Sequence, residues 1–180
     1  MLRITIPSTE QWDSKNRQFV YTEEKTLELE HSLVSLSKWE SKWNKSFLSK
    51  KGKTDEEVLD YIRCMTLTPD VKPEVYMCLT EDNIREINDY INAPMTATVF
   101  SEDGNTRGGS EIVTSELIYY WMVALNIPFE CQYWHLNRLI TLVRVCNIKN
   151  TPPKKRSQRE IMSRNAKLNA ARKQQFNSTG

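Results

Sequence analysis

Apolar residues recur at helical spacing through residues 110–149, and the rest of the chain is organised around this segment. Trp121 and Leu125 lie on the same face of a helix that Ser110 is placed to cap. Asn126 suits the left-handed residue that ends such a helix. The pattern therefore predicts one helix over about residues 110–125 and a bend directly after it.

A second helix is predicted over about residues 128–146, with Pro128 in its first turn. Most of its circumference is apolar, and a helix of this kind is buried on several sides. We therefore expect it to be the central helix of the fold. Its few polar positions form a narrow stripe: Glu130, Asn137, Arg138, Thr141 and Arg144.

The first thirty residues show a different periodicity. Leu2, Ile4 and Ile6 alternate with polar residues, which predicts a strand that ends at Pro7. Residues 19–21 are expected to pair with it, and residues 27–30 to form a further strand. These segments predict a small N-terminal sheet that lies on the helices.

The middle of the chain carries signals for several helices. One begins at Ser32 and continues to about Asn44, and a capping box of Thr54 with Glu57 begins the next. A short helix is expected near residues 75–79, and Thr80 caps another. The expected apolar faces are Leu33, Leu36, Trp39, Trp43 and Phe47; then Val58, Leu59, Ile62 and Met65; then Ile84, Ile87 and Ile91.

Two connections and a tail complete the organisation. Residues 95–100 alternate and fit a strand or an extended connection, and residues 101–109 fit a surface loop. The predicted fold is mostly α within an α+β class: a compact helical domain around a central buried helix, with the small N-terminal sheet. This domain occupies residues 1–150, and a basic, flexible or partly helical tail occupies residues 151–180.

Charge is distributed unevenly between these two parts. Residues 149–180 contain nine Lys and Arg against one Glu, a net charge of +8, whereas residues 1–148 contain 16 basic and 22 acidic residues, a net charge of −6. The basic tail could bind nucleic acid nonspecifically by releasing counterions, but Phe176 is its one aromatic residue, so the stacking surfaces of single-strand binders are missing. Its candidate contacts are Lys154, Lys155, Arg156 and Arg159.

Composition narrows the function classes. With 39% hydrophobic and 27% charged residues, the chain fits a globular protein, and no apolar run reaches the ~20 residues of a membrane span. No secretory signal is evident after Met1, so a cytoplasmic location and reduced cysteines are expected.

Candidate chemistry is sparse. Cys131 and His135 share a helical face, as two metal ligands could, yet a structural zinc site needs four ligands at recognisable spacing. We interpret the pair as core residues and expect no metal, no cofactor and no catalytic site. No glycine-rich phosphate-binding loop is present.

Aromatic residues are the remaining candidates for function. Trp39 and Trp43 are one helical turn apart, and Tyr133 and Trp134 lie near the predicted bend. Core packing would account for them. The functional alternative is that at least one of the four anchors an apolar helix of another protein, since aromatic residues often dominate such interfaces.

Two stretches of sequence, residues 29–43 (LEHSLVSLSKWESKW) and 118–150 (IYYWMVALNIPFECQYWHLNRLITLVRVCNIKN), resemble a tail assembly chaperone family of long-tailed, siphovirus-type bacteriophages. The likeness covers most of the chain. It implies a non-enzymatic protein of the host bacterial cytoplasm that coats the long tape measure protein until the tail tube polymerises around it. The tail tube protein is a second candidate partner, and self-association is compatible with this role.

The resemblance also implies that a longer product can arise by programmed frameshifting, which residues 152–155 (PPKK) would allow but cannot demonstrate. Two alternatives remain. One is a structural tail or connector protein that stays in the virion. The other is a nucleic-acid-binding regulator that acts through the basic tail. No membrane partner is expected.

Overall fold

The computed structural model describes residues 1–13, 17–49, 52–100, 112–151 and 158–176. The chain divides into two units, Met1–Asn147 and Ile148–Gly180. The first unit combines four short strands with six helices and a 3₁₀ turn among the described residues, so the predicted α+β class with a small antiparallel N-terminal sheet is confirmed.

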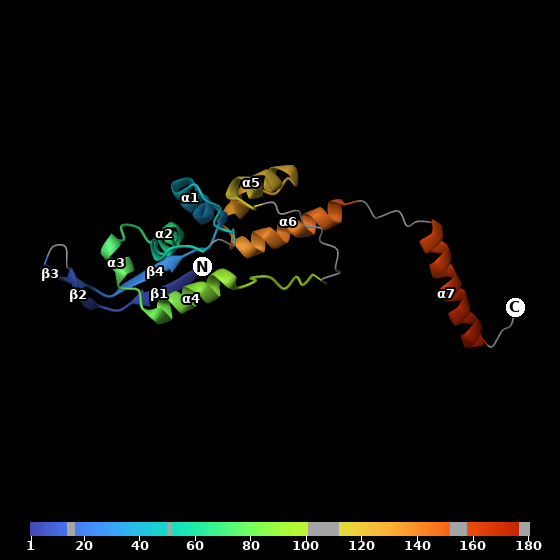
Figure 1. The fold of residues 1–180 in the computed structure, drawn as a ribbon, viewed down its shortest axis with the longest axis horizontal. Helices are drawn as coiled ribbons and strands as arrows, with labels where there is room; N and C mark the ends of the chain where they lie inside the picture. The colour runs from blue at the N-terminus through green and yellow to red at the C-terminus, as the bar shows by residue number, and fades with distance from the viewer. Residues whose placement is uncertain (14–16, 50–51, 101–111, 152–157, 177–180) are drawn as a thin grey trace. The chain divides into compact units, whose positions relative to one another are not determined.

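The N-terminal strands form one long hairpin in two sections. β1 (Leu2–Ile6) pairs with β4 (Lys25–Leu29), and β2 (Thr9–Asp13) pairs with β3 (Gln18–Thr22). The prediction that residues 19–21 pair with the first strand was therefore wrong. The partner of β3 is the strand just before it, because a short connection closes a hairpin at little entropic cost. The β2–β3 section, here called the arm, projects beyond the helices (Figure 1).

α1 (Leu33–Trp43) is the helix around which the unit is built. Ser32 caps its N-terminus by accepting a hydrogen bond from the Ser35 backbone N–H, and Asn44 ends it with a φ of 51°. Leu33 and Leu36 belong to one apolar cluster, whereas Trp39 belongs to another. A single helix thus contributes to both halves of the core.

Three further helices follow in sequence: α2 (Asp55–Met65), α3 (Pro73–Met77) and α4 (Glu81–Asn92). The predicted capping box of α2 is present, and Thr80 with Asn83 forms a second one at α4. Residues 95–100 contain no strand. Together with the β1–β4 ladder, these helices enclose the first cluster, whose fully buried members include Ile6, Leu27, Leu29 and Met65.

The apolar segment that begins near residue 110 contains α5 (Ser115–Ala124), the 3₁₀ turn η1 (Phe129–Tyr133) and α6 (Leu136–Asn150). Thr114 caps α5, so this helix begins later than expected; Ser110 and the loop at residues 101–109 lie outside the described residues. Asn126 does adopt the left-handed conformation, with a φ of 53°.

The predicted single helix over residues 128–146 is wrong over residues 128–135. A bridge between Ser32 and His135 holds the chain extended there, so α6 cannot start before Leu136. The prediction that this helix is buried on several sides is also wrong. The buried residues of α6 form a single stripe of Leu136, Leu139 and Val143. α1 takes the central position instead.

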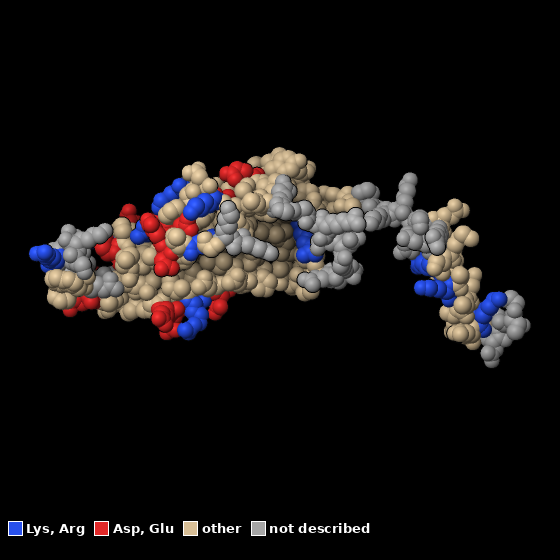
Figure 2. All heavy atoms as spheres, viewed as in Figure 1, with Lys and Arg blue, Asp and Glu red and all other residues tan. Residues whose placement is uncertain are grey.

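The second unit contains α7 (Gln158–Phe176), in which every described side chain is exposed and along which Figure 2 shows lysine and arginine side chains. The helical propensity of its alanines, lysines and arginines is sufficient to explain a helix without a buried face. In the parts of the chain that the structure describes, no helix has the length and apolar character needed to cross a membrane.

Candidate partner-binding surface

Trp39 belongs to the core and not to a binding surface. Its side chain is 1% exposed, and its indole N–H donates to the Glu57 backbone carbonyl at 2.8 Å. The ring of Phe47 packs edge-on against it, with centroids 5.1 Å apart. A partner could reach Trp39 only after local unfolding, so the core-packing interpretation describes this one of the four candidates.

Trp43 is half-buried and held by polar partners. Its indole N–H donates to Asp60 Oδ2 at 2.9 Å, and Lys42 Nζ contacts the other carboxylate oxygen at 2.5 Å. The ammonium groups of Lys42 and Lys45 lie 5.6 and 5.8 Å from the centroid of the Trp43 ring. Lys45 is also paired with Glu57. These contacts hold the ring against α2 and surround it with charge, which disfavours an apolar partner.

Tyr133 and Trp134 are neighbours in sequence but have different surroundings. Tyr133 is 63% exposed. Trp134 is half-buried, and the Arg138 guanidinium lies over its ring at 4.2 Å. Of the four candidate anchors, Tyr133 is the residue whose ring is most available to a partner.

Tyr133 is part of a larger exposed surface, which we call the α5–η1 surface. Tyr120 and Val123 lie on the outer side of α5, where three-residue spacing puts them on one face. Phe129 and Tyr133 mark the two ends of η1. Between 54% and 64% of each of these four side chains is exposed. Large apolar patches of this kind commonly mark protein-binding sites.

Tyr119 joins the two elements of this surface. Its hydroxyl donates to Gln132 Oε1 at 2.9 Å, and its ring lies 6.4 Å from that of Phe129. Burial, followed by the nearby Tyr133 hydroxyl, raises the pKa of Tyr119, so it remains a protonated donor at neutral pH. Because this contact spans the bend, η1 is fixed against α5 and the exposed rings are held in place.

A buried carboxylate fixes the surface to the rest of the unit. Glu40, 6% exposed on α1, accepts hydrogen bonds from the backbone N–H of Phe47 at 2.9 Å and of Ser115 at 2.7 Å. Ser115 is the first residue of α5, where a negative charge is favoured by the helix dipole. This acidic side chain therefore adds a polar link to the apolar packing of α5 on α1.

Two buried histidines lie where the two clusters meet. His31 Nδ1 is 2.6 Å from the Tyr61 hydroxyl, and the His31 and His135 rings are 5.1 Å apart. The Nε2–H of His135 donates to the Tyr90 carbonyl at 3.0 Å. Burial, reinforced by His135, lowers the pKa of His31 to about 3, and burial also lowers the pKa of His135. Both rings are neutral at physiological pH and act as packed hydrogen-bonding groups.

Cys131 and His135 are both buried, as the core interpretation predicts. Burial raises the pKa of the Cys131 thiol, so the thiolate that would bind a metal is disfavoured. Within the described residues, no three His, Cys, Asp or Glu side chains are grouped so that they could hold a metal ion. None of the four cysteines, all of which lie within the described residues, forms a disulfide bond.

Most of the basic residues predicted to make contacts lie outside the described part of the chain. Lys154, Lys155 and Arg156 lie outside the described residues, and Arg159 is part of α7. Sequence reasoning missed Val123 and Phe129 as members of the α5–η1 surface. The available signal was that α5 is apolar on every side, whereas only one side can face α1.

Comparison with known proteins adds no family assignment: no family model, no curated protein and no solved structure matches this chain.

Proposed function

We propose that this chain is a non-enzymatic tail assembly chaperone of a long-tailed bacteriophage, which binds the tape measure protein and keeps it soluble during tail tube assembly. The observation that carries the proposal is the α5–η1 surface. Its exposed rings at Tyr120, Phe129 and Tyr133, together with Val123, suit an apolar stripe on a partner helix. The resemblance of residues 29–43 and 118–150 to the chaperone family names that partner.

The character of the surface suits reversible binding. Rigid aromatic rings supply contact area with little loss of side-chain entropy, and the contact of Tyr119 with Gln132 holds the surface in shape before a partner arrives. Four exposed residues form a small interface, so each contact is expected to be weak. Many copies along one long helical partner would gain strength from multivalency and could still be displaced by the tube.

Co-expression of the chain with a tape measure protein tests the proposal. The variant Tyr120→Ser with Phe129→Ser should leave the chain folded but lose most of its ability to keep the tape measure soluble. Leu67→Ser is the matched control, because Leu67 is 55% exposed but lies between α2 and α3. If the double variant keeps the tape measure as soluble as the wild type does, the α5–η1 surface is not the binding site.

Mass spectrometry of purified virions separates this function from the structural alternative. A chaperone leaves before the tail is complete, so the chain should be absent from finished particles. Its presence at a fixed copy number per virion would favour a structural tail or connector protein.

A further inference from the structure

The arm carries a second aromatic surface, separate from the α5–η1 surface. Trp12 and Phe19 face each other across the ladder with ring centroids 5.0 Å apart, and Tyr21 lies opposite Glu10 in the same register. Because side chains alternate along a strand, these four residues share one face. Trp12, Phe19 and Tyr21 are 53%, 66% and 69% exposed.

This exposure is unusual for such a small element. A two-stranded hairpin is at best marginally stable alone in water, and it normally needs a further strand or a helix that packs against its apolar face. The ring of Trp12 packs against that of Phe19, its neighbour in the arm, and the arm extends away from the helices (Figure 1). The arm is therefore suited to contacting another molecule.

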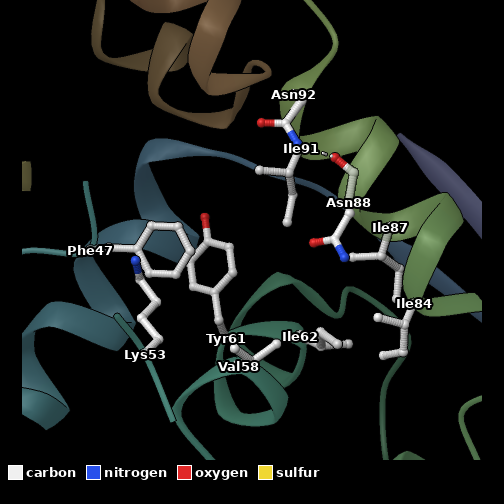
Figure 3. A pocket seen from close by; sticks show the side chains of 10 residues that line it. All are labelled: Phe47, Lys53, Val58, Tyr61, Ile62, Ile84, Ile87, Asn88, Ile91 and Asn92. Atoms are coloured by element: carbon white, nitrogen blue, oxygen red, sulfur yellow. Dashed lines mark hydrogen bonds between the residues drawn. The ribbon is translucent and has the colours of Figure 1, made fainter. Parts of the chain in front are cut away.

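A cleft of about 230 Å³ lies between α2 and α4 in the same unit (Figure 3). Its walls are mainly apolar and include Ile62, Ile84 and Ile87, and the ring of Phe47 closes one side. A cavity of about 150 Å³ with similar walls is known to hold benzene. The cleft can therefore accommodate an aromatic side chain.

A cationic side chain, that of Lys53, lines the cleft. Lys53 Nζ lies 4.4 Å from the centroid of the Phe47 ring, and it forms no ion pair with any carboxylate of the described residues. This lining suits an apolar group that has acidic neighbours, and it disfavours the basic helix α7 of the chain itself.

The arm has this combination of groups. Glu10 lies on its aromatic face, and Glu23 and Glu24 follow directly after β3, all three exposed. We propose that the arm of one copy inserts its aromatic face into the α2–α4 cleft of a second copy, with its carboxylates next to Lys53. The arm and the cleft are different surfaces, so the contact is head-to-tail and each added copy presents a new arm and a new cleft.

Sedimentation of the full chain at concentrations up to about 1 mM, where weak protein contacts become populated, tests the proposal. The wild type should form dimers and longer species as concentration rises, and added salt should weaken them. The double variant Trp12→Ser and Phe19→Ser removes two of the arm's three exposed rings, and Asn88→Trp places a ring over the exposed rim of the cleft. Each variant alone should self-associate at least about tenfold more weakly than the wild type.

Mixing the two variants gives the decisive result. The first retains an intact cleft and the second an intact arm, so together they should form a 1:1 dimer and no longer species. A mixture that stays monomeric, or an arm variant that associates like the wild type, would overturn the proposal. If circular dichroism shows that Asn88→Trp is misfolded, Lys53→Glu replaces it. A copy with Lys53→Glu should associate with a copy whose arm carries Glu10→Lys, because the charges are reversed on both sides of the contact.

The outcome is independent of the proposed function. Tyr120→Ser with Phe129→Ser should leave self-association unchanged, because these residues lie on the α5–η1 surface. If the wild type is monomeric throughout and the arm variant loses the tape measure instead, the arm serves that partner and self-association through it is refuted.

Discussion

Aromatic residues at the α1–α2 contact and at the α5–η1 surface have opposite roles. Trp39 and Trp43 donate their indole N–H groups to α2, one to a backbone carbonyl and one to Asp60. Tyr120 and Tyr133 leave their rings mostly in solvent. The difference shows that an aromatic residue becomes part of the core where the facing element supplies both cover and a hydrogen-bond acceptor. Where the facing element ends, the same residue types remain available for a partner.

The largest effect is expected at the α1–α2 contact. Trp39→Ala should reduce the free energy of unfolding by about 3–5 kcal/mol, because it removes a fully buried ring and leaves a cavity. Urea denaturation followed by circular dichroism measures this change. Trp39→Phe, which retains most of the ring, should cost clearly less; equal losses would mean that the hydrogen bond to Glu57 dominates and the packing does not.

Acidification should destabilise the contact between the two clusters. The pKa of His31 is about 3 in the folded state and near its ordinary value of 6.5 when unfolded, so the unfolded chain binds the extra proton. Stability is therefore complete above pH 6.5 and falls as the pH drops below it, by about 2 kcal/mol at pH 5 for this group alone. The lowered pKa of His135 acts in the same direction.

Denaturation curves at pH 7 and pH 5 check this expectation. At pH 5 most carboxylates are still ionised, so the change reports mainly on the histidines. The variant His31→Gln should be less stable at pH 7 but should lose less on acidification. A wild type whose stability is the same at both pH values would show that the histidines are not buried as neutral rings.

A smaller loss is expected where α5 is attached to α1. Glu40→Gln keeps the size of the side chain but leaves one of two backbone N–H groups, that of Phe47 or Ser115, without its acceptor. The free energy of unfolding should fall by about 1–2 kcal/mol. Glu86→Gln, at an exposed position within α4, is the matched control and should change stability by less than about 0.5 kcal/mol.

The smallest change in stability is expected at the exposed surface itself. Tyr133→Ala should alter the free energy of unfolding by less than about 0.5 kcal/mol, because the ring is 63% exposed. The same change should weaken binding to the tape measure protein measurably. Loss of stability comparable to that of Trp39→Ala would place Tyr133 in the core and remove it from the α5–η1 surface.

The sequence alone determined most local features of this protein. Ser32, Thr54 and Thr80 cap the helices they were expected to cap, and Asn126 ends α5 in the left-handed conformation. These features depend on residues within one helical turn, so periodicity and capping preferences are sufficient to find them. The α+β class followed from the same local signals.

Tertiary structure decided which surfaces are covered. The bridge between Ser32 and His135 moved the start of α6 to Leu136. The packing of both apolar clusters on α1 made α1 the central helix. The assignment of Trp39 to the core and Phe129 to the surface likewise depends on which element faces each ring. Periodicity specifies the apolar face of a helix but not its partner, because burial is a property of two elements brought together from distant parts of the chain.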